Sequence, residues 1–247
     1  MAADTPTILA TSIGLDSRGR DRYDADAGPV FDLAADLSGA TGTPKVCFVG
    51  TATGDDAAVI TTMYSALSAR FRPSHLEVFS MPNVDDVRGH LLAQDVVWVG
   101  GGSVANLLAL WRLHGWDEHL RAAWEAGVVL GGVSAGSLCW HLGGTTDSFG
   151  PTLRPVTNGL GFLPFSNGVH YDSERQRRPL YHSLIADGTL ADGYATDDGV
   201  GLVYRGTEMV EAVADRPNCA AYRVVREVDA DGIGTARETV IEPRRLR

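Results

Sequence analysis

The segment around Ser134 holds the residues whose types and spacing could do chemistry most directly. Residues 132–136 read Gly-Val-Ser-Ala-Gly and fit the pattern G-x-S-x-G. This pattern is typical of a sharp strand-to-helix turn, where small neighbours let strand and helix approach and the serine hydroxyl projects outward. An apolar run precedes it, and residues 137–142 favour a helix after it. We interpret Ser134 as a nucleophile and the N–H of Ala135 as an oxyanion donor; a tight turn used only for packing is the alternative.

A serine nucleophile needs a base, which is usually a histidine held by a carboxylate. His141 stands seven residues after Ser134 and would lie two turns along the same helix, so we expect a packing or surface role for it. His182 lies in a helix-like stretch. His170 stands where an apolar segment gives way to a polar one. That loop position suits a base, although an exposed loop histidine is the alternative. No histidine follows His182, and this order differs from that of the α/β-hydrolases.

Five motifs follow one another between residues 95 and 202: VWVGGGS, GGVSAGS, TTD, NGVHYDSERQRR and DDGVGL. Their order resembles that of the S51 serine peptidases, which include peptidase E (alpha-aspartyl dipeptidase) and cyanophycinase. The resemblance implies an α/β fold that is flavodoxin-like and class I glutamine amidotransferase-like. Such a fold has a mostly parallel sheet with helices on both faces and a nucleophile turn.

The same resemblance implies roles for individual residues. Ser134 matches the family nucleophile, and His170 matches the general base. The acid that holds the histidine is expected to be Asp198, which stands in DDGVGL, with Asp147 in the TTD motif as the second candidate. For either aspartate, a surface carboxylate or a turn cap is the alternative.

The glycine run at residues 100–102 matches the glycine loop of the family. The resemblance implies that Gly101 or Gly102 completes the oxyanion hole. The string GGGSVA also fits the dinucleotide fingerprint G-x-G-x-x-[GA], which requires an acidic residue at the end of a second strand about 20 residues later. Asp117 and Glu118 stand there and open a predicted helix instead. We therefore expect no organic cofactor, and nothing in the sequence calls for a metal.

Arginines follow His170 in the string DSERQRRP. In peptidase E, arginine near this point is associated with binding the aspartate side chain of the substrate, and a guanidinium suits a carboxylate bidentately. The resemblance therefore makes Arg175 and Arg178 candidate substrate-binding residues. The alternatives are a solvated basic helix start and pairing of these arginines with Glu174.

The pattern of apolar residues predicts the elements that must position these side chains. Near-continuous apolar runs indicate strands covered on both faces, and apolar residues spaced by threes and fours indicate the helices between them. Their alternation favours a mostly parallel sheet with right-handed crossovers. Residues 16–29 favour a polar loop, and the alternating C-terminal part favours antiparallel hairpins. The strands are expected at 7–12, 45–51, 76–81, 95–100 and 127–134, the helices at 55–71, 103–115 and 116–127, and the hairpins within 200–215 and 220–243.

Composition limits the class of protein. The 247 residues, 44% of them hydrophobic, fit one domain spanning 1–247. The formal net charge of −10 argues against binding of nucleic acid or of an anionic membrane surface. Three separated cysteines argue against a disulfide framework and favour a reducing compartment. The first residues do not have the pattern of a signal peptide, and no apolar run approaches the ~18–20 residues of a membrane helix, so we expect a cytoplasmic location.

These observations together predict a serine exopeptidase for small peptides, with dipeptides that carry N-terminal aspartate as one candidate class, acting through an acyl-enzyme. Its partner is a small peptide substrate, and a homodimer is left open. Two alternatives remain. The chain could be an amidotransferase-like binding module that has lost catalysis, or it could be an esterase or a cyanophycinase-like β-aspartyl peptidase.

Overall fold

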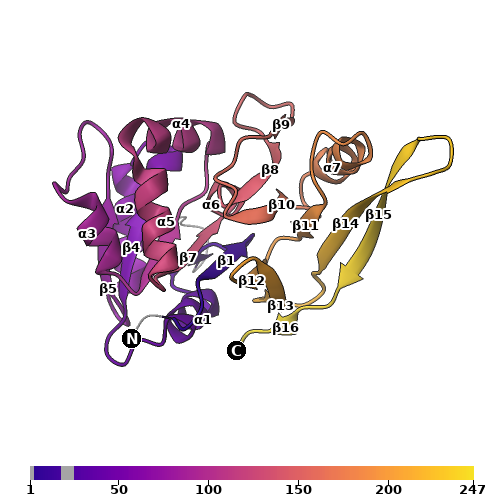
Figure 1. The fold of residues 1–247 in the computed structure, drawn as a ribbon. Helices are drawn as coiled ribbons and strands as arrows, with labels where there is room; N and C mark the ends of the chain where they lie inside the picture. Colours follow the sequence, from indigo (N-terminus) through magenta and orange to yellow (C-terminus); the bar gives the residue numbers. More distant parts are fainter. Residues whose placement is uncertain (1–2, 18–24) are drawn as a thin grey trace.

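An eight-stranded sheet runs through the centre of the molecule in a computed structural model that describes residues 3–17 and 25–247. Five consecutive strands, from the middle of this sheet to one of its edges, are mutually parallel, as the alternation of strands and helices predicts. The strand order is β16-β13-β12-β1-β7-β6-β4-β5 (Figure 1). The parallel strands are β1 (Thr7–Thr11), β7 (Val129–Val133), β6 (Val96–Val99), β4 (Lys45–Val49) and β5 (Arg72–Leu76). The others are β12 (Val200–Arg205), β13 (Glu208–Ala214) and β16 (Arg244–Arg245).

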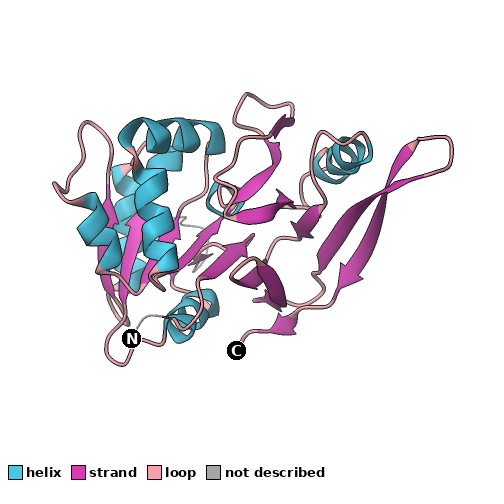
Figure 2. Ribbon diagram, in the orientation of Figure 1, coloured by secondary structure: helices cyan, strands magenta, loops and turns pink. Residues whose placement is uncertain are grey.

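Helices cover both faces of this sheet (Figure 2). On one face, α1 (Pro29–Ser38) and α2 (Ala57–Leu67) bury their apolar residues with Phe48 and Trp98. On the other face lie α3 (Val87–Leu92), α4 (Val104–His114) and α5 (Trp116–Glu125). Because both faces are covered, β1, β7, β6 and β4 are buried along almost their whole length, whereas in the edge strand β5 only Leu76 is buried. This is the predicted layered α/β architecture.

A second sheet of six strands lies beside the first, in the order β15-β14-β11-β10-β8-β9. Its three middle strands β8, β10 and β11 are parallel. The long β14–β15 hairpin confirms the antiparallel C-terminal region and extends away from the helices that cover the first sheet (Figure 1). Helix α7 (Arg177–Ala186) packs on it. The strands are β8 (His141–Thr146), β9 (Arg154–Val156), β10 (Leu163–Gly168), β11 (Gly193–Thr196), β14 (Ala221–Val228) and β15 (Gly234–Ile241).

Short elements complete the described chain: a 3₁₀ turn at Thr51–Thr53, a one-turn helix α6 (Ala135–Leu138), and a ladder between β2 (Asp16–Ser17) and β3 (Ala25–Asp26). The polar loop predicted at 16–29 thus begins and ends in paired residues and runs into α1, while residues 18–24 lie outside the described part. No helix in the described part has both the length and the hydropathy of a membrane span.

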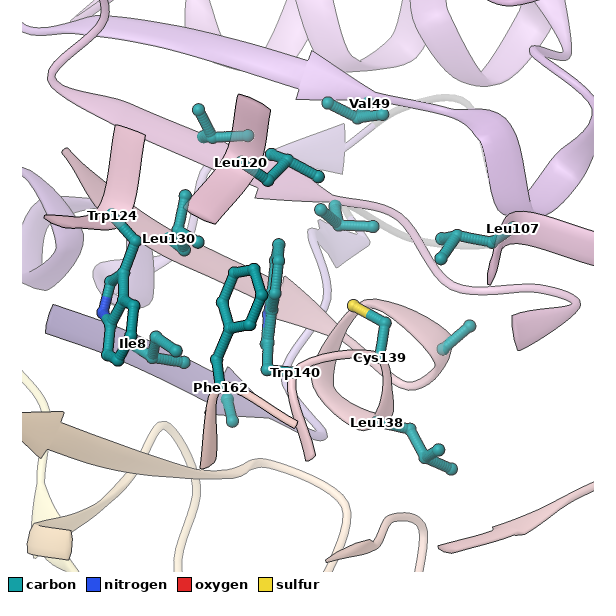
Figure 3. Close-up of a cluster of buried hydrophobic side chains, with 14 of the residues drawn as sticks. Ile8, Val49, Leu107, Leu120, Trp124, Leu130, Leu138, Cys139, Trp140 and Phe162 are labelled. Atoms are coloured by element: carbon teal, nitrogen blue, oxygen red, sulfur yellow. The ribbon is translucent and has the colours of Figure 1, made fainter. Parts of the chain in front are cut away.

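An aromatic cluster joins the parallel sheet to the second sheet and fixes the segment that follows Ser134 (Figure 3). The ring of Phe162 stacks on Trp124 at a centroid distance of 5.4 Å and lies 5.8 Å from Trp140. Leu138 and Cys139 are buried in the same cluster. Burying each side chain of this size stabilises the fold by about 1.5–3 kcal/mol, so the turn after Ser134 is held rigidly.

Two predicted elements differ from those observed. The strand expected at 76–81 is instead β5, which ends at Leu76, because the Asp55 carboxylate accepts the N–H groups of Val78 at 2.6 Å and Phe79 at 3.0 Å and turns the chain away. The helix expected at 137–142 ends after one turn, and His141 begins β8. The prediction that His141 lies two turns along a helix is therefore wrong.

Candidate active site

Ser134 lies in a strained turn between β7 and α6. Its backbone has φ 57° and ψ −111°, a conformation that side chains rarely adopt. The turn is held from both sides, because Ser134 N–H donates to Thr11 O at 3.0 Å and Leu138 N–H donates to Ser134 O at 2.9 Å. Strain of this kind costs about 1–3 kcal/mol and persists where the surroundings over-determine it. The geometry is that of the turn predicted from G-x-S-x-G.

The glycines of the motif are needed for close backbone approach. A Cβ atom at Gly132 would lie 2.6 Å from both the Val99 and the Gly136 carbonyl oxygens. A Cβ atom at Gly136 would lie 2.2 Å from the Val99 carbonyl oxygen. Strand β6, strand β7 and helix α6 therefore meet at this point only if both residues are glycine, which is the physical reason for small residues around Ser134.

His170 and Asp198 follow the carboxyl ends of two neighbouring parallel strands. Strands β10 and β11 pair Gly168 with Ala195 near their ends, so the two following loops lie side by side. The Nδ1 atom of His170 is hydrogen-bonded to the Asp198 carboxylate. The backbone N–H of His170 also donates a hydrogen bond to the hydroxyl of Ser12 at 3.1 Å. Since Ser12 follows β1, the neighbour of β7, this bond links the His170 loop to the sheet that carries Ser134.

Ser134 and His170 line one open pocket of about 390 Å³. Among the described residues, no hydrogen bond joins the Ser134 hydroxyl to the imidazole in this state. Catalytic hydrogen bonds are often long before substrate binds and tighten in the complex. The pocket is lined by Gly102, Ser103, Ser134, Asp147, Ser148, His170 and Glu174.

Several groups hold Asp198 in place and keep it ionised. Its N–H donates to the Asp172 carboxylate at 2.8 Å, and Arg216 Nε donates to its carbonyl oxygen at 2.7 Å. Burial raises the pKa of the Asp198 carboxyl, but hydrogen bonds from His170 and Ser173 together with nearby positive charge leave the pKa below its ordinary value. Arg216, whose Nη2 lies 3.7 Å from Oδ2, carries part of this charge. Asp198 is therefore a carboxylate that can orient the imidazole and stabilise its protonated form.

Backbone N–H groups lie free beside the nucleophile. Within the described part of the chain, those of Gly101, Gly102 and Ala135 have no acceptor. A Cβ atom at Gly101 would lie 3.3 Å from Ser134 Cβ and 3.9 Å from its hydroxyl oxygen, which shows how closely this loop approaches. Gly102 has φ 131°, and a Cβ atom there would lie 2.4 Å from Ala52 O. These donors are available for an oxyanion formed at Ser134.

The other predicted site residues lie in different surroundings. Asp147 is exposed and lines the pocket, and among the described residues it makes no bond to His170. Arg178 forms an ion pair with Glu238, and its guanidinium lies 4.8 Å from the ring centroid of Tyr222. Arg175 is exposed, and within the described chain it has no ion pair. Neither arginine is among the residues that line the pocket.

Sequence reasoning left Arg177 between a solvated helix start and pairing with Glu174, and it missed Ser12 and Arg216. Arg177 is 2% exposed, with Nη2 2.5 Å from Glu174 Oε2 and Nη1 donating to Thr145 O, so this cation lies beneath the pocket wall. Ser12 has a signal in the sequence, because it is the last residue of the first predicted strand. No sequence pattern marks Arg216 as part of the site, because it stands 82 residues after Ser134 and contacts only Asp198 of the proposed triad. Among the described residues, no three His, Cys, Asp or Glu side chains gather as a metal site would require.

Comparison with known proteins decides the family. Peptidase family S51 matches residues 19–212. The chain belongs to peptidase family S51. It is 44% identical to the uncharacterized peptidase YgaJ of Bacillus subtilis (strain 168) over 183 residues, which cover 74% of this chain and 78% of that protein. The predicted family and peptidase activity are thereby confirmed.

Two solved protein structures have the same fold as this S51 peptidase. A peptidase from an acI-B1 Actinobacterium aligns with a TM-score of 0.67 and 15% identity over 98% of this chain and 96% of that chain. A candidate peptidase E from Listeria monocytogenes EGD-e aligns with a TM-score of 0.61 and 17% identity over 85% and 98%. At these identities the likeness concerns the fold alone, and it agrees with the fold class predicted from the sequence.

Proposed function

We propose that this S51 peptidase is a serine exopeptidase for small peptides, with Ser134 as nucleophile, His170 as general base and Asp198 as the acid that holds the base. The observation that carries the proposal is that His170, whose Nδ1 is hydrogen-bonded to Asp198, lines the same pocket as Ser134 on its strained turn. This bond leaves Nε2 of His170 as the ring nitrogen that can accept a proton.

The reaction then runs in two halves. The Ser134 hydroxyl oxygen attacks the scissile carbonyl while His170 Nε2 takes its proton. The oxyanion accepts hydrogen bonds from the free backbone N–H groups of Ala135 and of Gly101 or Gly102. His170 passes the proton to the leaving amine, the C–N bond breaks, and an acyl-serine remains. Water then attacks the ester, again with proton transfer through His170, and releases the acid and the serine hydroxyl.

The size of the pocket supports small substrates. Its volume of about 390 Å³ lies within the usual range for small-ligand sites, which is about 300–1,000 Å³. Selectivity for N-terminal aspartate through Arg175 and Arg178 has less support. Arg178 forms an ion pair with Glu238, and Arg175, which has no ion pair among the described residues, does not line the pocket.

Labelling with a serine-reactive fluorophosphonate tests the proposal. We expect wild-type protein to be labelled and to hydrolyse dipeptides, Ser134→Ala to lose both, and Ser68→Ala, changed at an exposed serine on the far end of α2, to keep both. A binding module without catalysis would not be labelled. Hydrolysis of esters without peptides would indicate an esterase, and hydrolysis of β-aspartyl isopeptides alone would indicate a cyanophycinase-like enzyme.

A further inference from the structure

A second pocket of about 440 Å³ lies beside the proposed nucleophile on the face of the sheet covered by α1 and α2. Its walls are mostly apolar, with the rings of Phe48 and Trp98 and the side chain of Met63 among them. These three side chains are almost completely buried, so they form a preformed surface and not a mobile one. Val59 of α2, half-buried, also lines this pocket. A cavity of this kind suits an apolar side chain of a substrate.

The apolar pocket and the catalytic pocket meet at two adjacent pairs of residues. Gly101 and Val133 line the apolar pocket, whereas the next residues, Gly102 and Ser134, line the catalytic pocket. The short distance between the Cβ position of Gly101 and Ser134 Cβ, 3.3 Å, places the boundary at the nucleophile itself. When Ser134 attacks the carbonyl of a substrate residue, the amino group and the side chain of that same residue can therefore reach the polar pocket and the apolar pocket respectively.

The charges of the catalytic pocket favour a cation and oppose an anion. Among the described residues that line it, none is a lysine or an arginine. Glu174 forms an ion pair with Arg177, which lies beneath it, and the charge of Arg177 acts on Asp147 only at longer range. Asp147 is exposed and, within the described chain, has no ion pair. A substrate carboxylate in this pocket would face the Asp147 carboxylate, whereas an ammonium group would be attracted to it.

We infer that the substrates are short peptides with a free N-terminus and an apolar first residue, whose carbonyl Ser134 attacks. The α-ammonium group lies against Asp147, and the side chain enters the pocket formed by Phe48, Met63 and Trp98. This inference rests on the proposed function and deepens it, because it assigns selectivity to two sets of residues. The expected substrate preference thus changes from an acidic first residue to an apolar one. Asp147 is assigned to substrate binding and not to the triad.

A panel of 4-nitroanilides tests the substrate class. We expect kcat/KM for Leu and Phe derivatives to exceed that for the Asp derivative by at least tenfold. N-acetylation of the Leu derivative removes the ammonium charge and should lower kcat/KM at least tenfold. In Asp147→Asn, this difference between free and acetylated substrate should shrink by a similar factor. A preference for the Asp derivative, or equal hydrolysis of free and acetylated Leu substrates, would overturn the inference.

Variants of α2 test the apolar pocket separately. Val59→Trp should fill the pocket and lower kcat/KM for the Leu and Phe derivatives at least tenfold, while a fluorophosphonate with a small ethoxy group still labels Ser134. Thr61→Trp, on the exposed side of the same helix, should leave both unchanged. Unchanged Leu and Phe hydrolysis in Val59→Trp would overturn the inference and leave the proposed function intact. Absence of both labelling and hydrolysis in the wild type would overturn both.

Discussion

Replacement of Ser134 by glycine should make the protein more stable than replacement by alanine, although both variants lack the proposed nucleophile. Ser134 has φ 57°, where a Cβ atom is strained and a glycine is not. Both substitutions remove the hydroxyl, so the comparison isolates the Cβ atom.

The expected size follows from two opposed effects. Relief of the strain is worth about 1–3 kcal/mol. Glycine loses more backbone entropy on folding than alanine, which costs about 0.5–1 kcal/mol. The difference is about 1 kcal/mol in favour of Ser134→Gly, and for a chain of this length about 1 kcal/mol corresponds to a rise of about 2–4 °C in Tm.

Thermal unfolding followed by circular dichroism or calorimetry measures this difference at one scan rate and protein concentration. Gly136→Ala serves as the opposite control, because its Cβ atom would lie 2.2 Å from Val99 O and must lower Tm. Equal Tm values for the two Ser134 variants, or a higher value for Ser134→Ala, would refute the reasoning that backbone strain is stored at the proposed nucleophile.

Three further predictions concern charge. Asp198→Asn should lower kcat by about 10³–10⁴-fold while the protein still folds, because the imidazole loses the group that fixes its tautomer; steady-state kinetics and circular dichroism check this. Arg216→Gln should raise the pKa of the Asp198 carboxyl, because it removes a cation that favours the carboxylate, with Arg216→Lys lying between it and the wild type; NMR titration of this carboxyl checks the shift, and an unmoved pKa would contradict the role of this cation. Burial lowers the pKa of His141 to about 4, so the unfolded chain binds a proton there more readily and stability should fall as pH drops from about 6.5 to 4. His141→Gln should flatten that loss in urea unfolding measured at pH 4.5 and pH 7, and an unchanged slope would assign it to other groups.

Ser134 and His170 of the proposed triad have local signals in the sequence, whereas Asp198 was implied by the family resemblance, with Asp147 as second candidate. Ser134 stands in a motif whose glycines are required by close backbone contacts, and His170 follows an apolar run that ends where β10 ends. Since β10 and β11 are neighbouring parallel strands, the loops after them meet, and this brings Asp198 to the imidazole. The order of strands and helices also predicted the layered fold, because burial on both faces leaves a near-continuous apolar run.

The parts that sequence reasoning missed depend on contacts between distant segments. Arg178 looked like a carboxylate receptor for substrate, but it pairs with Glu238, 60 residues later in the chain. The end of β5 at Leu76 is set by the Asp55 carboxylate, which local strand propensity does not reveal. His141 begins a strand, and its buried imidazole is hydrogen-bonded to Ser137 O and to the hydroxyl of Tyr204, which lies 63 residues later in the chain. Periodicity describes one segment at a time and cannot supply such partners.

The bond between His170 N–H and the Ser12 hydroxyl has a consequence for how activity responds to remote change. Ser134 is carried by one sheet, and His170 by the other, so the reacting groups are aligned only while the two halves keep their mutual position. The stacking of Phe162, which precedes β10 of the second sheet, on Trp124 of helix α5 contributes to that position. A substitution at this contact changes no catalytic residue, yet a shift of one sheet against the other by a fraction of an ångström is enough to misalign Ser134 and His170. We therefore expect loss of activity in a protein that is still folded.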